Sequence, residues 1–179
     1  GETKKFVIVG NKVLVLSNNG SDWLLQTDWR EWRAVTFGKG LFVGTEGWFS
    51  SDPIAYSTDG RVWTGTVPRD FLGSSRTGVF YGITYGAGMF VAVGMGVNVA
   101  DAAVPYSSDG MKWTWNRIIT DWDFLDVTYG SEGFIAVGQA GMIYRSPDGI
   151  NWSLERIDNA GTLRGVAFGN NRYVAVGDS

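Results

Sequence analysis

Four copies of one short motif divide the sequence into units of similar length. Each copy has a serine, any residue, Asp or Asn, and glycine, and a tryptophan follows after two more residues. The four serines stand 40, 50 and 39 residues apart, and the copies occupy residues 17–23, 57–63, 107–113 and 146–152. A period of this size predicts an architecture that repeats one supersecondary unit.

The residue types of the motif are typical of a tight turn. An Asp or Asn side chain accepts hydrogen bonds from backbone amides just ahead of it, and glycine supplies a positive φ. The tryptophan ring packs back over the turn. A calcium loop needs several carboxylates, whereas each copy fixes one, so we interpret the motif as structural. The residues with this structural role are Ser17, Asn19, Trp23, Ser57, Asp59, Trp63, Ser107, Asp109, Trp113, Ser146, Asp148 and Trp152.

Short apolar runs closed by glycine lie between the motifs and predict β-strands. Each unit has one run ending in aromatic-glycine, a second rich in Val and Ala, a third leading into the motif and a fourth starting at its tryptophan. β-Branched and aromatic residues in runs of this length favour strands joined by hairpin turns. The unit is therefore a four-stranded antiparallel meander of about 40 residues, the size of one propeller blade.

With these four motifs the chain resembles the Asp-box β-propeller family, which occurs in sialidases and in many surface and phage tail proteins. The resemblance covers nearly the whole chain. It implies an all-β fold, a β-propeller of about four to five blades' worth of four-stranded units. The chain is also similar to lectin-like and phage or bacterial surface modules, but a fold of this kind hosts many functions.

The predicted blades form a single domain over residues 1–179. Complete blades are expected at 32–67, 80–119 and 125–158. Residues 6–27 correspond to strands two to four of a blade, and 163–177 to strands one and two. If the C-terminal segment completes the first blade, that blade has two candidates for its second strand, the run from Phe6 and the run from Tyr173. Closure into four blades, a fifth blade built between chains and assembly of partial propellers all remain open, because an unpaired edge strand invites pairing with another chain.

Composition excludes several classes of partner. The 179 residues are 44% apolar with a net charge of −3 and no Lys/Arg cluster, so nucleic acid is not expected as a ligand. No apolar run approaches the length of a membrane span. Without Cys there is no disulfide framework. We expect no cofactor and no metal, and the resemblance favours an extracellular or virion-surface location.

Strand order predicts which face could bind a ligand. The motifs occupy the turns between third and fourth strands, so the long insertions fall on the opposite face. These insertions are expected at 45–54, 65–79 and 95–104, with shorter connections at 28–31 and 120–123. Aromatic rings beside acids, amides and arginines suit sugars, although the same rings could seal the seams between blades. The candidate ligand-binding residues on this face are Trp48, Phe49, Asp52, Asn98, Asp101, Trp122 and Arg69.

The leading hypothesis is therefore a non-enzymatic recognition module for carbohydrate, of the lectin or phage receptor-binding kind, with homo-oligomers through shared or swapped blade strands. The alternatives are a protein-docking propeller, or a scaffold fragment or engineered repeat without a ligand. A sialidase-like glycoside hydrolase is the weaker reading, because no residue lies in a family-like catalytic motif and the chain lacks His and Cys. A sugar binder should present several equivalent aromatic pockets, and a docking protein one asymmetric patch.

Overall fold

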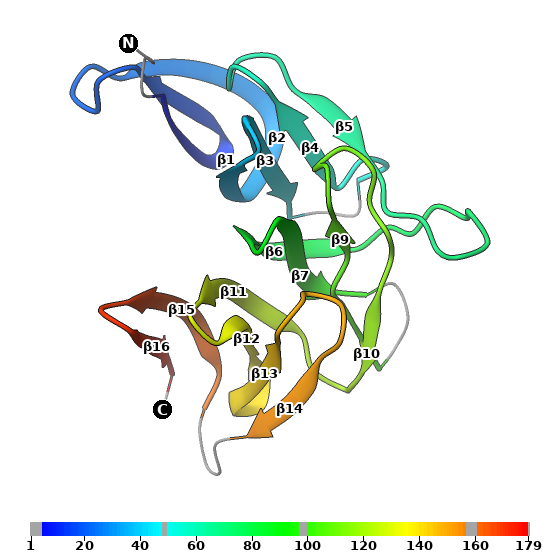
Figure 1. Ribbon diagram of the computed structural model, residues 1–179. Helices are drawn as coiled ribbons and strands as arrows, with labels where there is room; N and C mark the ends of the chain where they lie inside the picture. The colour runs from blue at the N-terminus through cyan, green and yellow to red at the C-terminus, as the bar shows by residue number, and fades with distance from the viewer. Residues whose placement is uncertain (1–4, 48–49, 97–99, 157–160, 179) are drawn as a thin grey trace.

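The computed structural model describes residues 5–47, 50–96, 100–156 and 161–178. Within them the chain is all-β and forms four antiparallel sheets, with one three-residue 3-10 turn, η1 (Gln139–Gly141). Figure 1 shows the sheets following one another as blades along an arc. The predicted fold class, an all-β propeller architecture, is confirmed.

The first sheet has the order β1-β2-β3-β4-β5. Its strands are β1 (Phe6–Ser17), β2 (Leu24–Gly38), β3 (Leu41–Glu46), β4 (Ile54–Ser57) and β5 (Thr64–Thr66). β1 folds back on itself near Lys12, where φ is 57°. Val7 and Leu16, one from each half of β1, accordingly lie against the same glycine, Gly60.

The second and third sheets repeat this meander. The second contains β6 (Val79–Gly86), β7 (Met89–Met95), β8 (Asp101–Ala103), β9 (Tyr106–Ser107) and β10 (Arg117–Ile119). The third contains β11 (Phe124–Gly130), β12 (Gly133–Gly138), β13 (Met142–Ser146) and β14 (Ser153–Arg156). β7 pairs with β6 on one side and with both β8 and β9 on the other.

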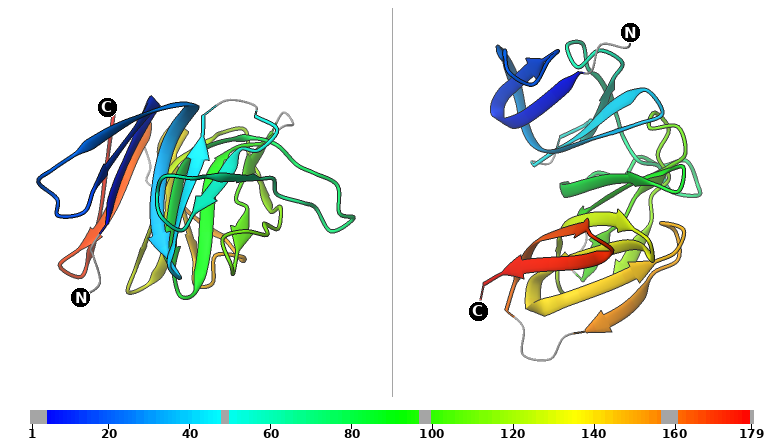
Figure 2. Two further views of the ribbon diagram at one scale, coloured as in Figure 1. Left: turned by 90° about the horizontal axis from the view of Figure 1, so that it is seen from above. Right: turned by 60° about the vertical axis from the view of Figure 1, so that its left-hand side comes forward.

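The last sheet is a two-stranded hairpin, β15 (Leu163–Gly169) with β16 (Arg172–Gly177). Its turn residues Asn170 and Asn171 both have positive φ, which matches the twist of a two-residue hairpin. Figures 1 and 2 show this hairpin at one end of the arc and β1 at the other.

The first strands of successive units lie side by side on the inner side of the arc, in the order β2, β6, β11, β15. Each carries a bulge at the same register, after Trp32, Phe80, Phe124 and Leu163. Because the bulge recurs in every unit, residues at equivalent positions can be compared directly between blades.

The core fills the two seams between the complete sheets. One cluster joins the first and second sheets around Phe80 and Phe90, and the other joins the second and third around Phe124 and Phe134. β3 and β12, which pack in these seams, are buried along their whole length, whereas most of β16 is exposed. The continuous apolar runs reflect burial on both faces.

Two features differ from the expected strand pattern. β2 runs unbroken from Leu24 to Gly38, because the short connection at 28–31 stays extended and Glu31 pairs with Asn11 of β1. The expected insertion at 95–104 contains a strand, β8, whose three residues are all buried. Its pairing with β10 extends the second sheet beyond the predicted loop.

Candidate functional site

The four repeated motifs form turns with the same pattern of serine and Asp or Asn hydrogen bonds. In the third copy, the Ser107 hydroxyl accepts the Gly110 amide at 2.8 Å, and Asp109 Oδ1 accepts the amides of Met111 and Lys112 at 2.8 and 2.7 Å. The Trp113 indole donates to the Gly110 carbonyl at 3.1 Å. The same bonds recur around Ser57, Asp59 and Trp63, and around Ser146, Asp148 and Trp152.

The first copy keeps the polar bonds but presents its tryptophan differently. Asn19 Oδ1 accepts the amides of Ser21 and Asp22 at 2.9 and 2.8 Å, and the Ser17 hydroxyl accepts the Gly20 amide. Trp23 packs at a tilt on Phe6 and is 42% exposed. In all four copies, the Ser hydroxyl and the Asp or Asn Oδ1 accept backbone amides of their own turn.

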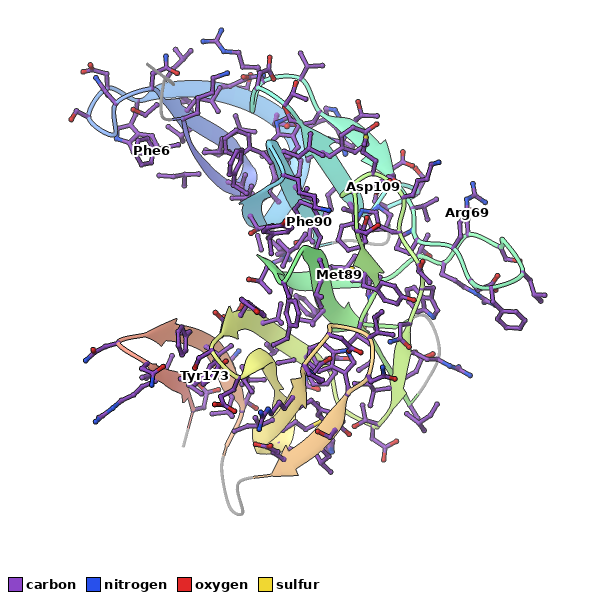
Figure 3. The ribbon with its side chains drawn as sticks, viewed as in Figure 1. Phe6, Arg69, Met89, Phe90, Asp109 and Tyr173 are labelled. Atoms are coloured by element: carbon purple, nitrogen blue, oxygen red, sulfur yellow. The ribbon has the colours of Figure 1, made fainter. Side chains whose placement is uncertain are left out.

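The surface feature that stands out is the loop at residues 67–78 between β5 and β6, called here the projecting loop. It extends outward from the rim of the arc, with Arg69 on it (Figure 3). At its base, the loop forms backbone hydrogen bonds with the second sheet. The Arg69 amide donates to the Trp113 carbonyl at 3.0 Å, and the Trp115 amide donates to the Arg69 carbonyl at 2.7 Å. The loop is thus anchored by backbone hydrogen bonds.

Asp70 organises the tip of the projecting loop. Its Oδ1 accepts the amides of Leu72 and Ser74 at 3.0 and 2.9 Å, and its Oδ2 accepts two hydrogen bonds from Arg76 at 3.0 and 2.7 Å. Desolvation raises the pKa of Asp70, but these hydrogen bonds outweigh it and the pKa is lowered. The carboxylate fixes a turn on which Phe71 is 93% exposed.

A groove of about 300 Å³, called here the rim groove, lies between the projecting loop and the outer edge of the second sheet. Its lining combines aromatic rings, guanidinium groups and an amide, contributed by Asp70, Phe71, Arg76, Thr114, Trp115, Asn116 and Arg117. The Trp115 ring lies 6.4 Å from that of Phe80 and is held by the core. Asn116 donates its amide to the Ile150 carbonyl at 2.8 Å, which ties the groove to the next blade.

Both guanidinium groups of the rim groove are more exposed than the carboxylates with which they pair. Arg117 pairs with Asp101 at 3.3 Å, and the Asp101 side chain is only 2% exposed while that of Arg117 is 51% exposed. Arg76 is 42% exposed over Asp70, which is 9% exposed. The surface offered to a ligand is therefore cationic and aromatic, with its balancing charges underneath.

The predicted ligand residues are dispersed rather than gathered. Arg69 donates to the Gly73 carbonyl at the tip of the projecting loop, and Asp101 pairs with Arg117 from the buried strand β8. Asp52 packs against Gly65, and Trp122 is 49% exposed; neither lines the rim groove. Trp48, Phe49 and Asn98 lie outside the described residues.

Trp115, Asn116 and Arg117 were missed from the sequence. The available signal was a second tryptophan two residues after Trp113, which the other three motif copies lack.

Two other polar groupings lie near the starts of the inner strands. Arg30 pairs with Glu46 in a buried contact and stacks 4.6 Å from the Trp29 ring centre. Burial raises the pKa of Glu46, and Arg30 offsets part of this effect. The pKa of Tyr81 is raised by burial and by the charge of Asp123.

A sialidase-like site would need several arginines together on one substrate carboxylate. Arg30, Arg69 and Arg76 instead engage separate partners: Arg30 binds Glu46, Arg69 binds the Gly73 carbonyl and Arg76 binds Asp70. In the described part of the chain, no group of three acidic side chains is placed to hold a metal ion. No helix among the described residues is long and apolar enough to cross a membrane.

No protein-family model and no curated protein matches the sequence. The structure is similar to YCF48 from Cyanidioschyzon merolae, with a TM-score of 0.61 and 12% identity over 94% of this chain and 61% of that chain. A structure of YCF48 bound to a D1 peptide aligns with a TM-score of 0.47 and 16% identity, over 97% of this chain and 72% of that one. The Bombyx mori GH32 β-fructofuranosidase BmSUC1 aligns with a TM-score of 0.48 and 14% identity, over 80% and 40% of the two chains.

The chain therefore spans about three-fifths, 61%, of the YCF48 chain from Cyanidioschyzon merolae that it resembles. At such low identity the likeness concerns the fold alone. Together with the four antiparallel sheets, it establishes a β-propeller architecture.

Proposed function

We propose that this chain is a non-enzymatic recognition module that docks a partner protein by holding a peptide segment in the rim groove. The observation that carries the proposal is Phe71, 93% exposed on a turn that Asp70 fixes through four hydrogen bonds. An exposed apolar side chain on a turn whose backbone is already fixed binds a partner with less loss of backbone conformational entropy. Aromatic residues and arginine are also the side chains most enriched in binding hot spots.

The lining of the rim groove suggests the chemistry of the peptide. Arg76 and Arg117 suit a carboxylate, and the rings of Phe71 and Trp115 suit an adjacent apolar side chain. The projecting loop belongs to a single blade connection, so the groove is one asymmetric patch rather than a set of equivalent pockets. The carboxylates at the groove, Asp70 and Asp101, are engaged by arginines, which supports binding rather than acid–base chemistry.

The test is selection from a random peptide library with the purified chain. We expect enrichment of peptides with an acidic residue next to an aromatic or aliphatic one. Phe71→Ala should weaken their binding about tenfold or more. Leu72→Ala is the matched control, because Leu72 is 75% exposed on the same tip but does not line the groove. Equal effects of the two substitutions, or no enriched peptide, would contradict the proposal.

A carbohydrate ligand is the second candidate. It is supported by Trp122, 49% exposed on the loop face, and by the Phe71 and Trp115 rings beside Asn116. A glycan array distinguishes the two: binding that Trp122→Ala removes, with no selected peptide, would favour a lectin. Absence of glycan binding would argue against this candidate.

A further inference from the structure

Neighbouring blades meet through a glycine–aromatic contact that occurs three times within the chain. Each end of the arc has one of the two residues of this contact without its partner. In each internal copy, the glycine that ends one inner strand faces an aromatic ring of the next inner strand. A Cβ at that glycine would lie 2.0–2.4 Å from a ring carbon, in the pairs Gly38 with Tyr85, Gly86 with Tyr129 and Gly130 with Phe168. The strand registers make these positions equivalent. Glycine is thus required wherever a next blade is present.

Each end of the series lacks its counterpart. An added Cβ at Gly169, the fourth glycine, would meet no atom of the described residues within 4 Å. Phe37, the first ring of the series, is 57% exposed. One end therefore offers a glycine without a ring, and the other offers a ring without a glycine.

A second vacancy lies at the same end of the arc, at Gly10 of β1. Gly94, Gly138 and Gly177 each face the carbonyl of the residue that precedes or begins an inner strand, with a Cβ only 2.0–2.1 Å from its oxygen. Gly10 closes the corresponding apolar run of β1, and an added Cβ there would meet nothing within 4 Å among the residues that the structure describes. A single additional inner strand beside β2 would fill both vacancies at this end.

We propose that a second copy of this chain supplies that strand: β15 of one copy docks beside β2 of the next, with Gly169 beneath Phe37 and the backbone ahead of β15 against Gly10. The contact continues the blade-to-blade interface already present in each chain. It covers exposed apolar side chains at the β1 end, where Phe6 is 42% and Ile8 is 52% exposed. The chain's own β15 lies at the opposite end of the arc, beyond β6 and β11, as the positions of Phe6 and Tyr173 show in Figure 3.

In the joined pair, residues 6–10 of one copy and β16 of the other compete for the same edge of β15. β16 is the strand that yields, because five of its six residues are exposed. Its side-chain anchor is the Tyr173 hydroxyl, which donates to the Gly133 carbonyl at 2.9 Å and accepts the Glu132 amide at 3.1 Å. The exchange replaces one antiparallel pairing by an equivalent one and is head-to-tail, so it can extend beyond two copies.

Light scattering over a concentration series tests the association. We expect the wild-type mass to rise above 19.6 kDa with concentration, and Gly169→Leu to stay at that mass. In an isolated copy the new side chain has open space, whereas in the assembly it occupies the place of Phe37. Thr64→Leu, at an exposed strand position, should associate like the wild type. A wild type that stays monomeric, or a Gly169→Leu variant that associates, would overturn the proposal.

Cross-linking identifies the contacting strands, because the chain has no native cysteine. Phe37→Cys and Gly169→Cys, mixed and oxidised, should give a disulfide-linked dimer that neither variant gives alone. A cross-link within one chain of the double variant, with none in the mixture, would show closure by the chain's own β15 instead. Tyr173→Phe removes the hydroxyl that holds β16, so half of the chains should be associated at a lower protein concentration than in the wild type. A higher concentration would show that β16 is not displaced.

Discussion

At the residue scale, one buried hydroxyl departs from the repeat. Thr45 is fully buried, and its Oγ1 has no hydrogen-bond partner among the described residues. Val93 and Val137 occupy the equivalent register in the next two sheets. A buried hydroxyl without a partner costs about 1–3 kcal/mol.

Thr45→Val should therefore raise the free energy of unfolding by about 1–2 kcal/mol in urea titrations. The control Thr64→Val, at an exposed site, should change it little; a loss of stability in Thr45→Val would mean that the hydroxyl is satisfied.

The motif carboxylates should make stability depend on pH in the acid range. Burial raises the pKa of Asp148, but the Asn151 and Ile150 amides more than offset it and lower the pKa from its ordinary 3.8 to about 2. A lowered folded-state pKa contributes stability above the unfolded value, and this is lost as pH falls from 3.8 towards 2. Asp148→Asn keeps the acceptor oxygen, as Asn19 does in the first motif. Its melting temperature should fall less than that of the wild type between about pH 5 and about pH 2. An identical fall would contradict a titrating role for Asp148.

At the element scale, the glycines that end the inner strands set how closely the blades pack. An added Cβ at Gly86 would lie 2.0 Å from Tyr129 Cγ, whereas one at Gly169 would meet nothing within 4 Å in the described part of the chain. Forcing a methyl group into a packed seam costs about 1–3 kcal/mol. Gly86→Ala should therefore lower the urea midpoint clearly, and Gly169→Ala should leave stability within about 0.5 kcal/mol. Equal losses at both positions would show that backbone conformation, not the seam, requires the glycines.

The elements also show what the sequence could and could not predict. The motif residues and the apolar runs beside them act locally, through turn bonds and pleated burial, so the strands and the propeller architecture were predictable. The rim groove was not, because it depends on Arg69 meeting Thr114 across a blade boundary, and no local pattern encodes that pairing. Asp101 was assigned to a ligand loop on its polarity, whereas pairing of β8 with β10 buries it beneath Arg117.

At the scale of the whole molecule, stability should decrease from the middle of the arc towards its ends. Both core clusters lie between complete sheets, around Phe90 and Phe134, while Val174 and Val176 on β16 are 58% and 61% exposed. In a repeat architecture each unit is stabilised mainly by its neighbours, so a unit with one neighbour opens first. Hydrogen exchange measured in dilute solution should show the amides of β15 and β16 exchanging before those of β7 and β12. As concentration rises, protection of β15 should increase, because a second copy covers it, while β7 and β12 stay unchanged. Equal protection of β15 and β12 at every concentration would mean that the chain's own β15 already closes the ring within one chain.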